Sequence, residues 1–211
     1  MKKWFAVLVS IAGILCFTAC GNSSASDSVE KSQKAKTQAD TKVQIAPKTQ
    51  TEEKTAVAVV YFSGTGNTQK VAQKMADILD ADIFEIKPEE PYTEEDLNYN
   101  DDNCRANQEM EDDSARPAIA NDLSVVLTYD TVYIGHPIWW GTAPRIIQTF
   151  LETYDLSGKT IYTFCTSGGS GIEQSISDLQ EDYPQLNILS GHRFAKDVTE
   201  EEIKEWLEEL K

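Results

Sequence analysis

The sequence predicts an α/β fold in which helices cover both faces of a parallel sheet. Three observations support this prediction. From residue 56 onward, short apolar runs typical of buried strands alternate with segments of helical periodicity. The strand-like runs are separated by helical segments rather than by hairpin turns, which favours parallel pairing. Three loops that follow strands are unusually rich in Gly, Ser, Thr or Trp, and such loops gather at one edge of a parallel sheet.

The first half of this region predicts two strands and one regular helix. Residues 56–62 are apolar and predict a buried strand, and Ile83–Ile86 predicts a second one. Between them, residues 68–79 place apolar side chains on one helical face. Residues 87–118 are polar and acidic with few apolar anchors, so we expect a long insertion that carries a loose surface helix.

The second half continues the alternation to the last residue. Strands are expected at Thr131–Gly135 and Thr160–Cys165, followed by a short one at Asn187–Leu189. Helices are expected from Pro144 to Leu151, around 172–179, and from Thr199, where Thr-x-x-Glu is a capping box, to residue 210.

The loop after the first strand reads Ser63-Gly64-Thr65-Gly66-Asn67-Thr68 and predicts an anion site at a helix start. It lacks the Lys of a nucleoside triphosphate loop, and Gln69 stands where a dinucleotide fingerprint needs its third Gly. A single phosphate monoester therefore fits best. The nearest basic residue is Lys70, so we expect neutral donors to hold the phosphate, with no Lys or Arg close to the site.

Two further loops predict what accompanies the phosphate. His136-Pro137-Ile138-Trp139-Trp140-Gly141 follows a buried strand, and two adjacent indoles there suit a flat aromatic ligand better than a core. Thr166-Ser167-Gly168-Gly169-Ser170 is small and rich in hydrogen-bond donors. A phosphate site, an aromatic wall and a small polar loop together describe a site for a mononucleotide with a planar ring system.

These motifs resemble those of the flavodoxin family, in its bacterial branch with a Pro-Ile-Trp-Trp loop and a Thr-Ser-Gly-Gly-Ser-Gly loop. The resemblance covers residues 56–211 and includes Pro91-Tyr92 and Ala115-Arg116-Pro117-Ala118 in the insertion. It implies a flavodoxin-like, three-layer α/β/α fold with a doubly wound five-stranded sheet of order 2-1-3-4-5. It also implies FMN as the cofactor and redox chemistry. The third loop departs from electron-carrier flavodoxins because it lacks an aromatic residue that stacks on the flavin.

Roles for the candidate residues follow from the resemblance. Ser63, Thr65, Asn67 and Thr68, with backbone groups of Gly64 and Gly66, are expected to hold the phosphate. In the second loop, Pro137–Gly141, either Trp139 or Trp140 is expected to stack on the isoalloxazine. In the third loop, residues 166–169, Ser167, Gly168 and Gly169 are expected beside the pyrimidine. No residue needs to act as an acid or base, because the flavin carries the chemistry. The scattered His and Cys residues show no metal-ligand spacing.

Charge restricts the class of partner. Residues 56–211 carry 11 basic and 30 acidic residues, a net charge of −19, which argues against nucleic acid or anionic lipid and suits a basic partner protein. In the negative electrostatic field of these charges, and without a nearby cation, oxidised FMN should bind more tightly than its reduced, anionic form. Arg145 leaves two alternatives open, because it could approach the flavin or lie solvated in the first turn of its helix.

The N-terminus predicts export and a membrane anchor. Lys2 and Lys3 precede an apolar stretch, and Phe17-Thr18-Ala19-Cys20 resembles the lipobox of bacterial lipoproteins. We expect residues 1–20 to be a lipoprotein signal, 21–55 a disordered polar linker and 56–211 the flavin domain. Lipid on Cys20 would hold the chain on the extracytoplasmic side of a bacterial cell membrane. An ordinary signal peptide or a short membrane anchor is the alternative.

Three functions are compatible with these features. The first is FMN-dependent electron transfer to a redox partner protein or a small acceptor. The second is an NAD(P)H-dependent FMN oxidoreductase that reduces a quinone or another small molecule, and the third is a module that binds FMN without redox turnover. The sequence names neither the electron donor nor the acceptor, and it leaves open whether Cys104 and Cys165 form a disulfide.

Overall fold

The computed structural model describes residues 56–211, so the expected signal peptide, linker and lipidated Cys20 lie outside the described residues. Five parallel strands form one sheet in the order β2-β1-β3-β4-β5, which confirms the expected topology. The strands are β1 (Val57–Tyr61), β2 (Asp82–Glu85), β3 (Thr131–Pro137), β4 (Thr160–Thr166) and β5 (Asn187–Phe194).

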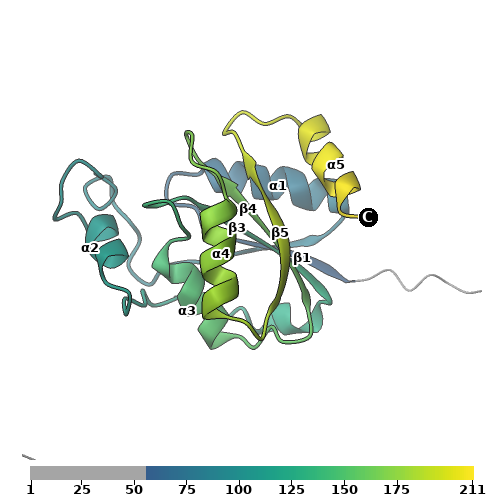
Figure 1. The fold of residues 1–211 in the computed structure, drawn as a ribbon, viewed down its shortest axis with the longest axis horizontal. Helices are drawn as coiled ribbons and strands as arrows, with labels where there is room; N and C mark the ends of the chain where they lie inside the picture. Colours follow the sequence, from purple (N-terminus) through teal and green to yellow (C-terminus); the bar gives the residue numbers. More distant parts are fainter. Residues whose placement is uncertain (1–55) are drawn as a thin grey trace, which may run out of the picture. The chain divides into compact units, whose positions relative to one another are not determined.

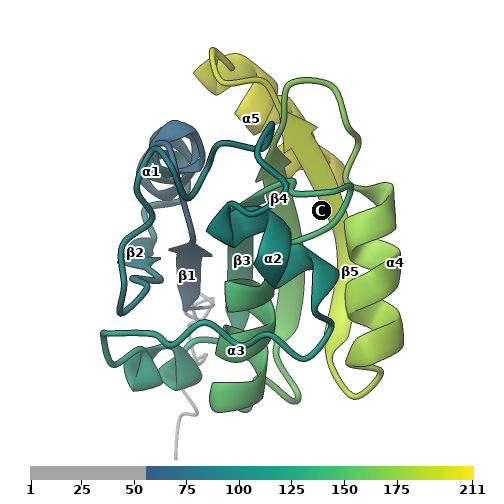
Figure 2. The same cartoon turned by 90° about the vertical axis from the view of Figure 1, so that its left-hand side faces the viewer.

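Helices cover both faces of this sheet, as expected for a three-layer fold (Figure 1 and Figure 2). On one face lie α1 (Asn67–Leu79) and α5 (Glu200–Glu209), and on the other lie α3 (Arg145–Thr153) and α4 (Glu173–Asp182). A short helix, α2 (Arg105–Glu111), belongs to the insertion, and a 3-10 helix, η1 (Ser124–Thr128), leads into β3. Figure 1 shows α2 standing apart from the sheet.

Successive side chains of a strand point to opposite faces of the sheet, so the strands form one apolar layer on each face. Val59 and Tyr61 of β1 point toward α1 and α5, whereas Val60 and Phe62 point toward α3. Because both faces are covered, β1 reads as a continuous apolar run rather than an alternating one. The expected capping box at Thr199 is also present, with the Glu202 backbone N–H donating to its side chain.

The structure corrects the sequence analysis in two segments. β5 has eight residues rather than three, since Gly191, His192 and Arg193 extend it along the exposed sheet edge, where no apolar run is needed. The expected loose helix is instead packed, because α2 buries Ala106 and Met110. Both changes matter for the site, because β5 contributes Arg193 to it and α2 holds the turn that contributes Tyr99.

Two properties of the described residues complete the fold. Cys104 and Cys165 are buried free thiols and form no disulfide. Within residues 56–211, we find no helix with the length and apolar character needed to cross a membrane.

Candidate functional site

The three candidate loops meet at one cavity of about 660 Å³ at the carboxyl edge of the sheet. A volume of this size is typical of small-molecule sites. Residues from five segments line it: Thr65 and Asn67; Tyr99; Pro137, Ile138 and Trp139; Thr166, Ser167 and Gly168; and Arg193, Ala195, Lys196 and Asp197. The structure therefore brings together the loops that the sequence singled out and adds two segments that it did not.

The first loop has the geometry of an anion site. Gly66 adopts a left-handed backbone (φ 80°) immediately before α1, a conformation that favours glycine. No side chain caps α1, so the backbone N–H groups of its first turn are free to bind an acceptor. The Ser63 hydroxyl is buried and has no hydrogen-bond partner in the described part of the chain. Such a donor fits a ligand that supplies the missing acceptor.

A buried pair of hydroxyl groups connects the first and third loops. The Thr68 and Thr166 Oγ1 atoms lie 2.8 Å apart, which ties the first turn of α1 to the end of β4. Thr166 lines the cavity, whereas Thr68 lies behind it, buried. Only one of the two hydroxyl hydrogens is used in this bond, so the pair can still donate one hydrogen bond to a ligand.

The two adjacent indoles of the second loop occupy different environments. Trp139 is 3% exposed and makes edge contacts with the rings of Phe62, Tyr92 and Tyr99, while one side of it lines the cavity. Trp140 is 67% exposed. The expectation that neither indole fits a core is therefore wrong for Trp139, because the insertion supplies aromatic neighbours that the sequence did not place beside it.

A buried amide in α2 fixes the position of Trp140. The Asn107 side chain is nearly inaccessible; its Oδ1 accepts from Trp140 Nε1 at 3.0 Å. Its Nδ2 donates to the Asp101 and Tyr99 carbonyl oxygens at 2.9 and 3.3 Å. Trp140 also holds a left-handed backbone (φ 50°), which costs free energy for a residue with a side chain. Asn107 thus joins the turn that carries Tyr99 to the exposed indole.

The sequence analysis missed Tyr99 as a residue of the cavity. It lies in the insertion, 38 positions before Pro137 in the chain, yet both line the same cavity. Tyr92 is half-buried in the same aromatic cluster, where Arg105 stacks 4.1 Å from its ring centre and Glu109 accepts from its hydroxyl. Burial, followed by the contact with Glu109, raises the pKa of Tyr92 far above its usual range. Aromatic side chains in an otherwise polar insertion were the available signal.

Cations at the cavity correct a second expectation. Arg193 at the end of β5 and Lys196 after it both line the cavity, so the expected absence of a nearby Lys or Arg is wrong. The sequence could not reveal this because β5 was expected to end at Leu189. The expected preference for oxidised FMN depended on that absence and loses its stated basis.

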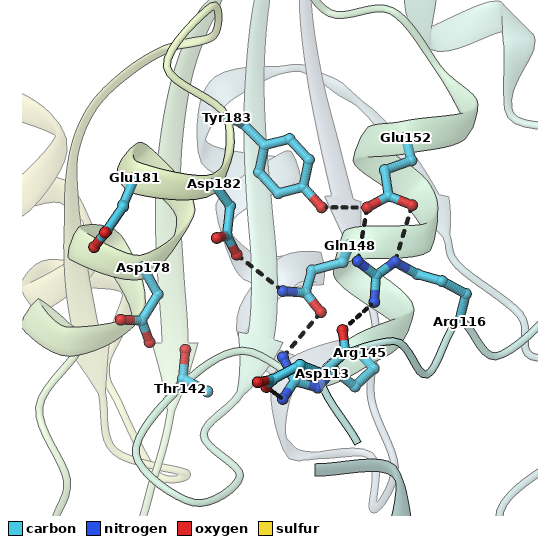
Figure 3. Close-up of a pocket in the computed structure, with 10 residues that line it drawn as sticks. All are labelled: Asp113, Arg116, Thr142, Arg145, Gln148, Glu152, Asp178, Glu181, Asp182 and Tyr183. Carbon is cyan, nitrogen blue, oxygen red and sulfur yellow. Dashed lines mark hydrogen bonds and ion pairs between the residues drawn. The ribbon is translucent and has the colours of Figure 1, made fainter. Parts of the chain in front are cut away.

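Arg145 takes neither of the two positions considered for it. Its guanidinium is buried and donates to the Met110 carbonyl oxygen at 3.1 Å and to Asp113 Oδ1 at 2.5 Å. Figure 3 shows it in a second, polar cavity of about 540 Å³ between the insertion, α3 and α4, where Arg116 also pairs with Glu152. Hydrogen bonds link most of its side chains, from Asp113 through Arg145 and Gln148 to Asp182, and from Arg116 through Glu152 to Tyr183, and we interpret this network as the attachment of the insertion to the core.

The histidine of the second loop is structural. His136 is fully buried at the end of β3, and its Nδ1 lies 3.0 Å from the Pro137 carbonyl oxygen. Burial lowers the pKa of His136 to about 4, so the imidazole is neutral at physiological pH. It does not line the cavity.

Comparisons with known proteins agree with this architecture. A family model described as flavodoxin matches residues 56–210. A crystal structure from Bacteroides eggerthii, provisionally described as a flavoprotein, is 43% identical, covers 73% of this chain and 96% of its own, and has a TM-score of 0.70. A second crystal structure with the same description, from Bacteroides uniformis, is 41% identical, covers 73% of this chain and 98% of its own, and has a TM-score of 0.71.

A more distant structure shares the fold alone. The flavoprotein from Lactobacillus acidophilus, solved in complex with FMN, is 23% identical, covers 72% of this chain and 99% of its own, and has a TM-score of 0.53. No curated protein matches the chain.

Proposed function

Since the chain belongs to the flavodoxin family, we propose that its cavity binds FMN and that the protein transfers electrons through this cofactor. One observation carries the proposal: a loop of uncharged donors, an aromatic wall and a small polar loop line a single cavity of suitable size. The unpartnered Ser63 hydroxyl and the open first turn of α1 fit a phosphate group in particular.

Each segment has a separate task in this proposal. Thr65, Asn67 and the backbone at the start of α1 bind the phosphate. Trp139 and Tyr99 provide apolar walls for the ring system, and Ser167 with Gly168 offers donors and close backbone approach at its polar edge. FMN supplies the electron-accepting and electron-donating chemistry when bound, so the protein's contribution is binding, orientation and electrostatics.

We further propose that the electron partner approaches a negatively charged surface outside the cytoplasm. The net charge of −19 over residues 56–211 favours a basic redox protein and disfavours nucleic acid. The lipobox-like Phe17–Cys20 supports attachment to a bacterial membrane through lipid on Cys20. Residues 21–55 would then connect the anchor to the flavin domain.

An NAD(P)H-dependent oxidoreductase is the second candidate, and one observation favours it. Gly168 and Gly169 have no neighbouring atoms where a side chain would stand, and no aromatic residue of that loop covers the cavity. A small substrate could therefore reach the ring from that side.

Titration of the flavin-free full-length protein with FMN tests the binding proposal. We expect one equivalent of FMN to be bound with its fluorescence quenched, and a protein that never takes up FMN would overturn the proposal. Steady-state NAD(P)H oxidation by the FMN-loaded protein then separates the two activities. An electron carrier turns over only when a reductase partner is added, whereas an oxidoreductase turns over alone.

A further inference from the structure

The cavity differs in charge from the rest of the described chain. Residues 56–211 carry a net charge of −19, yet the charged residues that line the cavity are Arg193, Lys196 and Asp197. Six of the eleven basic side chains in this part of the chain form ion pairs with carboxylates, and neither Arg193 nor Lys196 is among them. Two cations that form no ion pair within residues 56–211 thus line the cavity of an acidic domain, with Asp197 as the one carboxylate beside them.

Hydrogen bonding holds Arg193 at the third loop. Arg193 is paired with Cys165 in the β4–β5 register, and its Nη1 donates to the Ser167 carbonyl oxygen at 3.1 Å. A guanidinium has five N–H donors, and the described residues provide no other hydrogen-bond partner for this one. Its remaining donors are available to an anionic ligand.

The segment after Arg193 is attached to the helix that begins at the phosphate loop. Lys74 of α1 donates from Nζ to the Val198 carbonyl oxygen at 2.5 Å, and the Val198 N–H donates to the Ala195 carbonyl oxygen at 3.2 Å. The turn that carries Lys196 is therefore fixed against α1. Thr65 and Asn67 at the start of this helix line the same cavity as Lys196.

We propose that Arg193 and Lys196 form a cationic wall for the phosphate group of FMN and make the site selective for FMN over riboflavin. This inference rests on the proposed function. A phosphate monoester carries a charge of about −1.5 to −2 at neutral pH. The loop at residues 63–68 offers only uncharged donors, and the surrounding field of −19 opposes a dianion. The oxidised isoalloxazine ring of the flavin is uncharged and needs no cationic partner.

Binding titrations with FMN and riboflavin test the proposal on the full-length protein. Because Arg193→Gln removes a charged hydrogen-bond donor, we expect it to weaken FMN binding about tenfold. Lys196→Gln should weaken it about threefold, because both side chains are exposed to solvent but only Arg193 is held in place by a hydrogen bond to Ser167 among the described residues. Riboflavin affinity should change less than twofold in both variants. Because riboflavin has the same ring system, it also reports any disturbance of the Ser167 loop.

Two controls separate local from general effects. Lys204→Gln removes the same charge from α5, away from the cavity lining, and should leave FMN affinity unchanged. Arg193→Lys keeps the charge and should recover most of the FMN affinity. Equal losses for FMN and riboflavin, or an FMN affinity of Arg193→Gln within twofold of the wild type, would overturn the cationic wall. A wild-type protein that binds neither ligand would overturn the proposed function itself.

Discussion

The sheet and the insertion at residues 87–118 both contribute to one cavity, but different forces hold them. Buried apolar side chains fix the sheet, as in β1, where Ala58, Val59 and Val60 are completely inaccessible. The insertion carries eleven acidic residues, and it is attached by a few buried side chains, such as Ala106 and Met110, together with polar contacts of Asn107 and Arg145. We therefore expect the sheet side of the site to open only when the whole domain unfolds, whereas the insertion, which depends more on hydrogen bonds, should open at a lower free energy.

The largest effect should come from truncation of the sheet core. Phe164 is completely buried between β3 and α5 and fills the space that a side chain at Gly135 would occupy. Phe164→Ala should therefore lower the free energy of unfolding by about 3–5 kcal/mol, measured by urea denaturation. Leu189→Ala on the exposed side of β5 is the control and should cost less than about 0.5 kcal/mol. A similar loss in both variants would contradict the account of the core.

Acid should weaken the sheet through His136. Its pKa is about 4 in the folded protein against 6.5 for an ordinary histidine, so below pH 6.5 the unfolded chain binds a proton that the folded chain does not. The free energy of unfolding therefore falls as the pH drops from 6.5 to 4, by about 2 kcal/mol between pH 7.5 and 5. Comparison of this loss of stability in the wild type and in His136→Asn isolates the contribution of the histidine. An identical pH dependence in both would show that His136 titrates normally.

Loss of Arg145 should open the insertion and leave the sheet intact. Arg145→Met removes its bonds to the Met110 carbonyl and to Asp113, at an expected cost of about 2 kcal/mol to local stability. Hydrogen exchange of the α2 amides should then accelerate about 30-fold, with β1 and β3 amides unchanged. Equal acceleration in α2 and the sheet would show that the two regions unfold as one.

The smallest effect is expected at Asn107. Asn107→Ala leaves Trp140 without its partner and releases the carbonyl of Tyr99, which lines the cavity. It should therefore weaken FMN binding about fivefold, which corresponds to about 1 kcal/mol. Asn103→Ala removes an exposed amide from the same insertion and should have no effect on FMN affinity. The indole emission of Trp140 should shift only in the first variant. An unchanged FMN affinity and an unchanged Trp140 emission in Asn107→Ala would show that the insertion takes no part in FMN binding.

The sequence predicted the sheet well because the spacing of apolar residues and the composition of loops are local properties of the chain. Apolar runs located four of the five strands to within a few residues, and the carboxyl-edge rule brought the loops at 63–68, 136–141 and 166–171 together. The family resemblance contributed the strand order, which the structure confirmed.

The remaining part of the cavity depends on contacts between segments distant in the chain. Tyr99 reaches the site through its ring contact with Trp139 and through the bonds of Asn107 and Arg145 to the insertion, and hydrophobic periodicity does not reveal such contacts. Arg193 reaches it because β5 continues through Gly191 and His192 at the sheet edge, where polar residues obscure a strand pattern. The cations Arg193 and Lys196 therefore could not be predicted at the site from the phosphate loop alone.

Backbone amide NMR of the full-length protein during FMN addition is the most direct test of the central claim. The claim is that five separate segments form one flavin site. We expect shift changes at residues 63–68, 137–141, 166–169 and 193–197 and at Tyr99, all saturating at one equivalent of FMN. Changes confined to the polar cavity around Arg145, or scattered over both faces of the sheet, would contradict the account.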